Sequence, residues 1–178
     1  MGVTDLAGAS VSPGTKFSFS TDDYPLAVPD LVEDFNDHST RDAGETTAEW
    51  NTVSPGELVA SPVAGGESVG QSGWYDQFWP VASYATPTVD QAANGGTIEI
   101  FVQGSREDVS SPGNQPVDPV VDPERLFTTD WLPLANLDQL TYYQYLRFRV
   151  VFRVPATWVA TDPLPRVRRI DIPVSAKR

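Results

Sequence analysis

The chain has 178 residues, a length typical of one domain, and its 24 acidic and 12 basic residues leave a formal net charge of −12. The absence of cysteine excludes disulfides, thiolate nucleophiles and cysteine-bound zinc. The acidic balance disfavours contact with nucleic-acid phosphates, and no apolar run is long enough for a membrane span, so we expect neither nucleic-acid binding nor membrane insertion.

The N-terminal part of the sequence indicates a short leader followed by one folded domain. Residues 1–15 are mostly small, and they show neither the basic start nor the apolar core of a signal peptide. We therefore expect a flexible leader over 1–15 and a single domain over 16–178, in a chain that is either made in the cytosol or is a mature or excised piece. The 16 prolines and 13 glycines favour short strands and turns in that domain over helices.

The first half of the chain predicts several short strands. Residues 16–21, KFSFST, place Phe17 and Phe19 on one face and predict the first strand. The two prolines within 22–30 predict an extended crossing that takes no part in a ladder. Further short strands are expected at 31–35 and 57–61.

The clearest strands lie in the second half. Residues 97–105, TIEIFVQGS, alternate in a way that buries Ile98, Ile100 and Val102. Residues 142–154 predict a longer antiparallel strand with one wet face, because arginines alternate there with apolar residues. The apolar face of that strand consists of Leu146, Phe148, Val150, Phe152 and Val154, and the final strand, over 168–174, has Ile170, Ile172 and Val174 in phase.

The segment between these strands, residues 106–125, holds four prolines and one glycine and predicts a long exposed loop. No stretch of twelve residues shows a helical period. The predicted fold class is therefore all-β: a single antiparallel β-sandwich, jelly-roll-like, of roughly eight strands.

The order of these segments resembles a known family. An acidic EDFND…RD…TTAEWN segment precedes GELVAS and a central GGTIEIFVQGS, and TTDWLPL, YLRFRVVF and LPRVRRIDIP follow. Over roughly residues 30–174 this order is similar to that of galactose-binding-like, discoidin-type jelly rolls of bacterial exported or surface proteins and of phage tail or capsid appendages. The resemblance implies a usually non-catalytic domain that binds sugars, proteins or its own copies, commonly with calcium in one loop. It transfers no ligand residue, because the ligands of that family lie in variable loops.

The acidic segment from Glu33 to Asn51 is the first candidate site. It holds six carboxylates, three threonines, one serine and the only histidine of the chain. Calcium takes several oxygen ligands from one compact loop, so this segment could bind calcium, although its spacing is not that of an EF-hand. The alternative, which we favour, is a solvated loop whose Asp and Thr side chains cap local turns. The candidate calcium ligands are Asp34, Asn36, Asp37, Asp42 and Glu45.

Enzymatic motifs are weak in this sequence. His38 has no second histidine or cysteine near it, and no nucleophile elbow accompanies Ser39, so a surface histidine is expected. Among 24 acids, no signature selects a pair for glycoside hydrolysis. We therefore predict a non-enzymatic protein, with a hydrolase using paired carboxylates as the weaker alternative.

The densest aromatic cluster lies over residues 74–84. Aromatic faces stack on sugar rings and are favoured at protein interfaces, but a sandwich core also needs large residues. Trp74 and Tyr75 stand beside glycine and are the candidate ligand-binding pair. Trp79 is expected in the core, and Trp50 in the core or at its rim.

The arginines on the polar face of the long strand, Arg147, Arg149 and Arg153, are candidate interface residues. One interpretation pairs them with acids across their own sheet. The other pairs them with a neighbouring copy, because residues 1–100 hold 15 acids and 2 bases whereas 101–178 hold 9 and 10. Such a head-to-tail contact would generate rings or filaments.

Together these patterns predict a non-enzymatic β-sandwich module with a structural or binding role in an extracellular surface or particle assembly, such as a filament, a pilus or a phage. The alternative is a carbohydrate-binding module of an exported polysaccharide-active protein. The expected partners are copies of the chain, other assembly proteins or a glycan, with calcium as the one candidate cofactor. The expected location is extracellular or at the cell surface, or, alternatively, in a virion made in the cytoplasm.

Overall fold

The computed structural model describes residues 25–26, 29–53, 55–77, 81–105 and 128–177. Over these ranges the fold is all-β and antiparallel, as predicted, with two short 3₁₀ segments, η1 (His38–Thr40) and η2 (Leu134–Leu140). The predicted leader over 1–15, the strand over 16–21 and the loop over 106–125 lie outside the described residues.

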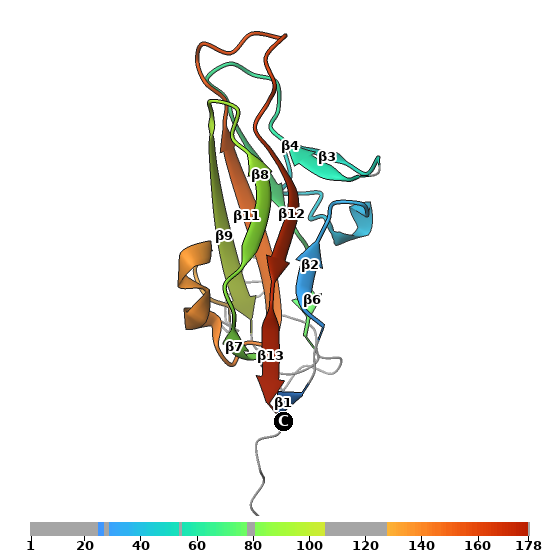
Figure 1. The fold of residues 1–178 in the computed structure, drawn as a ribbon, viewed down its shortest axis with the longest axis vertical. Helices are drawn as coiled ribbons and strands as arrows, with labels where there is room; N and C mark the ends of the chain where they lie inside the picture. The colour runs from blue at the N-terminus through green and yellow to red at the C-terminus, as the bar shows by residue number, and fades with distance from the viewer. Residues whose placement is uncertain (1–24, 27–28, 54, 78–80, 106–127, 178) are drawn as a thin grey trace, which may run out of the picture.

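One layer of the fold is a five-stranded sheet, which we call the long sheet (Figure 1). Its centre is the pair β9 (Thr97–Ser105) and β11 (Tyr145–Arg153), which pair along all nine residues. β10 (Leu132–Pro133) pairs with the other side of β9. β5 (Glu67–Gln71) and β6 (Tyr75–Asp76) both pair with β11.

The second layer is built around β12 (Arg166–Ile172). β8 (Thr88–Ala92) pairs along one edge of β12, and β2 (Leu31–Glu33) and β4 (Glu57–Val59) pair along the other, followed by β3 (Glu49–Asn51). Beyond Pro173 the chain enters β13 (Val174–Lys177), which lies between β1 (Pro25–Leu26) and β7 (Val81–Tyr84). Proline has no N–H to donate to a ladder, so Pro173 divides what would otherwise be one strand.

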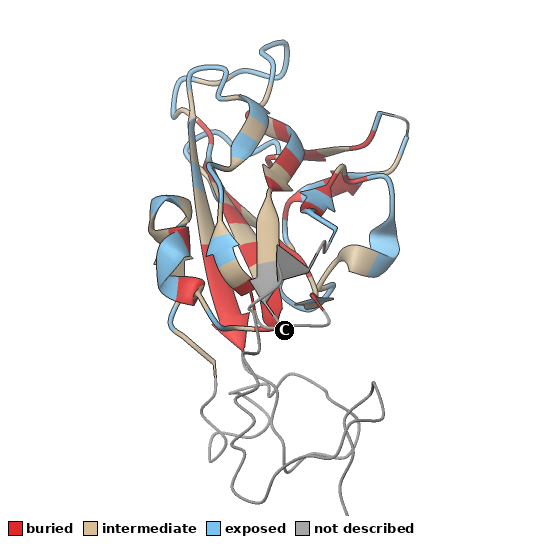
Figure 2. Cartoon of the chain, turned by 60° about the horizontal axis from the view of Figure 1, so that its bottom comes forward, coloured by how far each residue is buried: buried red, intermediate tan, exposed pale blue. Residues whose placement is uncertain are grey.

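The core lies between the two layers (Figure 2). Leu146, Phe148, Val150 and Phe152 of β11 are buried, and so are Ile170 and Ile172 of β12, which confirms the inward faces predicted for both strands. Trp50 is also buried, with its ring 5.1 Å from that of Phe35, so it belongs to the core. Trp79 lies outside the described residues.

The structure corrects the sequence interpretation at Pro25 and Leu26 and adds two features that the sequence patterns did not indicate. Pro25 and Leu26 pair with β13, whereas 22–30 was expected to cross without pairing; the proline is tolerated because β1 is an edge strand. The glycine-rich region holds strand β5, where a Cβ on Gly70 would lie 2.3 Å from Leu58 Cδ2, so glycine permits close packing. Gln103 lies on the outer side of β9 and is nevertheless buried, with its amide donating to the Thr129 carbonyl.

Candidate binding face on the long sheet

The outer side of the long sheet carries the predicted arginines. Strand alternation directs Arg147, Arg149 and Arg153 of β11 away from the core. The register places Gln103 directly opposite Arg147, Gln71 opposite Arg149 and Glu67 opposite Arg153. Each guanidinium therefore faces a polar side chain on a neighbouring strand.

Arg147 lies between two tryptophans. Its guanidinium carbon is 4.4 Å from the ring centroid of Trp74 and 5.1 Å from that of Trp131. Its Nε donates to Gln103 Oε1 over 2.7 Å, and its side chain is only 12% exposed. A guanidinium over an indole face is attracted by the ring quadrupole, and the effect grows as water is excluded. The two rings and the glutamine thus hold Arg147 in one orientation.

Arg149 extends the same arrangement. Its guanidinium carbon lies 4.4 Å from the Trp131 centroid, and its Nε donates to Gln71 Oε1 over 2.7 Å. The Gln71 amide donates to Asp42 over 2.8 Å, and Glu45 lies 3.4 Å from Arg149. We call this surface the Arg–Trp face; its residues are Trp74, Trp131, Arg147, Arg149, Gln71, Gln103, Asp42 and Glu45.

Arg153 lies on the same strand but outside the tryptophan pair. It is 52% exposed and forms ion pairs with Glu67 at 3.0 Å and Glu99 at 2.5 Å. The hydrogen bond with Glu99 and the charges of both carboxylates raise the pKa of Arg153 above its usual value. All three predicted interface arginines therefore have acidic neighbours within the chain. Arg153 pairs with acids on neighbouring strands of its own sheet, whereas Asp42 and Glu45 come from the acidic segment.

The acidic segment covers the free edge of β5. Asp42 N donates to the Gln71 carbonyl over 2.9 Å, and Ala48 N donates to the Val69 carbonyl over 2.8 Å. Because an open strand edge invites pairing with other chains, this cover removes one such edge. It also brings Asp42 and Glu45 over β5 towards the arginines of β11.

The other predicted calcium ligands accept hydrogen bonds from backbone N–H groups. Asp34 accepts from Asn36 N over 3.1 Å, and Asn36 Oδ1 accepts from Gly56 N over 2.8 Å. Asp37 caps η1 by accepting from the Ser39 backbone and hydroxyl, and these bonds lower the Asp37 pKa. The five residues are not brought together, and the described part of the chain has no group of three or more His, Asp or Glu placed to hold a metal ion. Calcium binding stays a hypothesis from the sequence alone, and these contacts argue against it.

Tyr75 does not share a face with Trp74. Its ring stacks on Phe148 at 6.1 Å between centroids, and its hydroxyl donates to the carboxylate of Glu33. Glu33 is only 3% exposed and also accepts from Phe35 N over 2.5 Å. Burial raises the pKa of Glu33, and burial together with the nearby carboxylate raises that of Tyr75. The predicted Trp74–Tyr75 pair is thus divided between the outer face and the interior.

Trp131 is the functional candidate that sequence reasoning missed. It comes just before β10, on the side of β11 opposite Trp74. The TTDWLPL signpost contained this tryptophan, but only the pairing of β10, β9 and β11 shows that it reaches the arginines. His38 is exposed, as predicted, with Nε2 at 2.9 Å from the Trp50 carbonyl oxygen.

Comparisons of this chain with family models, with curated proteins and with solved structures return no significant match. None of the helices in the described ranges has the length and apolar character that a membrane crossing requires.

Proposed function

We propose that this protein is a non-enzymatic β-sandwich module with a structural or binding role in an extracellular surface or particle assembly, and that the Arg–Trp face is its binding surface. The observation that carries the proposal is the interleaving of Trp74, Arg147, Trp131 and Arg149 on one side of a sheet. Tryptophan and arginine are the residue types enriched at the energetic centres of protein interfaces.

The charges of this face support a protein partner over a small anion, because the arginines already have acidic neighbours. Two arginines are balanced by Asp42 and Glu45, and their Nε groups already donate to Gln103 and Gln71. Such a surface has little net charge to attract a counter-ion. Its binding energy would come from the partly buried indoles and from arginines that are already ordered, which lowers the entropy lost on binding.

A glycan is the second candidate ligand. Trp74 and Trp131 both lie partly exposed beside a single guanidinium, and indole faces can stack on sugar rings. This alternative corresponds to a carbohydrate-binding module, and amide groups such as that of Gln71 would supply polar contacts to hydroxyls.

Fractionation of the organism that makes the protein tests the structural role. An epitope-tagged chain should accompany cell-surface or particle material, and the double variant Trp74→Ala, Trp131→Ala should shift to the soluble fraction. Trp158→Ala is the control, because Trp158 is also partly buried but does not belong to the face, and its indole N–H donates to the Asp162 carbonyl. A wild-type chain found only as a free soluble monomer would refute the proposal.

Affinity electrophoresis through a panel of polysaccharides tests the alternative. Retardation that disappears in the double tryptophan variant and persists in Trp158→Ala would identify a carbohydrate-binding module. Retardation by none of the polysaccharides would remove this second candidate and leave the assembly role to the fractionation result.

A further inference from the structure

A tight turn connects β8 to β9, and the two strands belong to opposite layers. In that turn Gly96 N donates to the Ala93 carbonyl over 2.9 Å, and both Asn94 and Gly95 have positive φ, at 49° and 82°. β8 then pairs with β12, whereas β9 pairs with β11 (Figure 1). Among the described residues, no strand pairs with the other edge of β8, or with residues 97–100 on the β10 side of β9. Within the described ranges, β8 and the first part of β9 therefore each have an unpaired edge, and both edges lie on one side of the sandwich.

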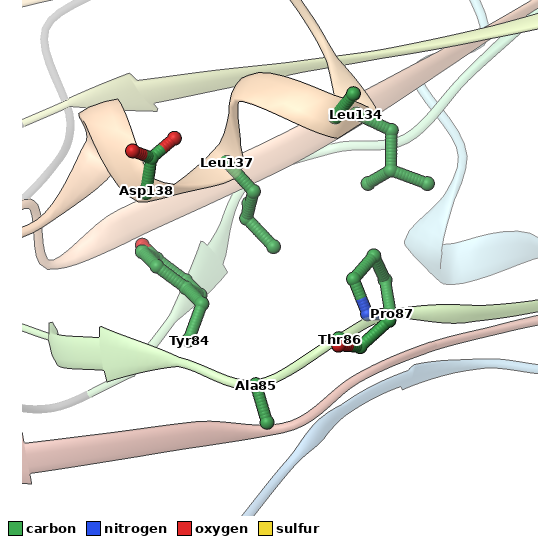
Figure 3. Close-up of a pocket in the computed structure, with 8 residues that line it drawn as sticks. Tyr84, Ala85, Thr86, Pro87, Leu134, Leu137 and Asp138 are labelled. Carbon is green, nitrogen blue, oxygen red and sulfur yellow. The ribbon is translucent and has the colours of Figure 1, made fainter.

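A groove runs between these two edges. It consists of two hollows of about 580 Å³ and about 390 Å³ that share Leu134 and Ala135 of η2. In the larger hollow, Leu134, Leu137 and Asp138 of η2 lie opposite Tyr84–Pro87 (Figure 3). The smaller hollow lies between β8 and β9, and besides Leu134 and Ala135 its apolar lining residues are Val89, Ile98, Ile100, Phe101 and Pro133.

The charged residues of the groove are acidic. Asp138 is exposed in the larger hollow, and Glu99 lies in the smaller one, where it pairs with Arg153. Neither hollow has a lysine or arginine among its described lining residues. An apolar groove beside open strand edges suits an extended peptide with alternating apolar side chains, bound by strand addition. A basic residue on that peptide would complement Asp138.

We infer that the groove binds residues 16–21 of a second copy of this chain. In KFSFST, Phe17 and Phe19 fall on one face, and Lys16 is one of only two basic residues among the first 100. A six-residue extended segment spans about 20 Å, close to the length of a five-residue strand such as β8. Apolar alternation, length and charge therefore all match the groove.

Geometry favours a second copy over the chain's own segment. Residue 25 begins β1, and β13 separates β1 from β7, next to which the groove lies. The five residues between Phe19 and Pro25 would have to carry the chain's own segment across both strands, a constraint that a neighbouring copy lacks. Direct pairing of two β8 edges about a two-fold axis is disfavoured, because the central Asp90 of each copy would face the other.

Insertion of one copy's segment into the next is a heterologous contact, which generates rings or filaments. The inference takes the proposed assembly role as given and supplies its self-contact. The groove is a surface distinct from the Arg–Trp face. Substitutions in the groove therefore test the self-contact, and substitutions in the Arg–Trp face test the binding surface, each without altering the other.

Sedimentation velocity of the purified full chain over a wide concentration range tests the inference. We expect wild type to form oligomers larger than dimers, and both Ala135→Arg, which blocks the junction of the hollows, and Phe17→Ser with Phe19→Ser to be monomeric. Gln139→Arg, exposed on the same η2 but outside the groove, and Ser18→Ala with Ser20→Ala are the matched controls and should assemble as wild type does.

A mixing experiment establishes that the contact is between copies. The Ala135→Arg protein keeps an intact segment, and the double phenylalanine variant keeps an intact groove, so an equimolar mixture should form dimers and stop there. A mixture that stays monomeric, or a wild type that is monomeric at every concentration, overturns the inference. Assembly lost in Trp131→Ala but kept in Ala135→Arg also overturns it, while leaving the Arg–Trp face as the assembly surface.

Discussion

Phe35 adopts a left-handed backbone conformation, with φ of 59°, although its side chain is bulky and fully buried. Such a conformation is strained and persists only where the surroundings enforce it. The backbone of Gly56 is one of those surroundings: a Cβ at that position would lie 2.4 Å from the Phe35 carbonyl carbon and 2.5 Å from its oxygen. The backbone conformation at Phe35 therefore requires a residue without a Cβ at position 56.

Gly56→Ala should lower the free energy of unfolding by about 3 kcal/mol, because the Cβ meets backbone that cannot swing aside. Gly44→Ala is the matched control, since its nearest neighbour would be Asp42 Oδ1 at 3.6 Å, an ordinary contact. Urea denaturation measures both variants. Equal stability of the two variants would show that the close approach of Gly56 to Phe35 does not constrain the fold.

Glu33 is a buried carboxyl group whose pKa is raised above its ordinary 4.5, chiefly by loss of solvation. The folded state therefore holds the proton more tightly than the unfolded state does. The contribution of Glu33 to stability is most favourable below pH 4.5 and falls as the pH rises through the folded pKa, because the carboxylate must then ionise inside the protein.

Glu33→Gln should remove this part of the pH dependence. Its amide oxygen can accept from Phe35 N and its amide nitrogen can donate to the Tyr75 oxygen, so both contacts have a replacement. We expect the variant to be at least as stable as wild type at neutral pH, with the advantage shrinking towards pH 4.5 in urea titrations. Val32→Ala, which alters an exposed neighbour on β2 without a titratable group, should leave the slope unchanged; a wild-type slope in Glu33→Gln would contradict the assignment.

At the scale of elements, alternation made β9 and β11 predictable. Their apolar residues recur at every second position, so sequence alone assigned Phe148 inward and Arg147 outward. It could not place Tyr75, because β6 has only two residues and shows no period. Nor could it bring Trp74 and Trp131 to the same guanidinium, since that contact depends on which strands flank β11.

Arg147→Ala should cost about 2 kcal/mol of stability, because it removes two cation–π contacts and leaves the buried Gln103 without one hydrogen bond. Arg168→Ala on β12 is the control; Arg168 is 42% exposed and 3.7 Å from Glu57, so its loss should cost well under about 1 kcal/mol.

A double-mutant cycle of Arg147→Ala with Trp131→Ala isolates the ring contact. We expect a coupling free energy of about 0.5 to 1 kcal/mol, since the contact is largely shielded from water. Strict additivity of the two substitutions would mean that the indole and the guanidinium are neighbours without mutual stabilisation.

For the whole molecule, the charge difference between the two halves of the chain is partly resolved by folding. Asp42, Glu45, Glu67 and Glu99 from the acidic half pair with arginines of β11, and Glu57 lies near Arg166 and Arg168 of β12. Sequence could weigh a calcium loop against a solvated loop, but the register that brings β5 beside β11 decides where these carboxylates lie.

These pairings lead to a prediction about calcium. A calcium ion bound by the five predicted ligands would have to draw Asp42 from Gln71, Glu45 from Arg149 and Asp37 from the start of η1. We therefore expect an EDTA-treated sample to melt at the same temperature with and without millimolar calcium.

Binding would be easy to detect. A ligand at a hundredfold excess over its Kd adds about 2.7 kcal/mol to the free energy of unfolding, which raises the melting temperature of a domain this size by several degrees. A rise of that size, abolished by Asp34→Ala but unaffected by Asp171→Ala, would show that the acidic segment rearranges around the ion. The edge of β5 would then lose its cover, and calcium would control whether that edge is open to another chain.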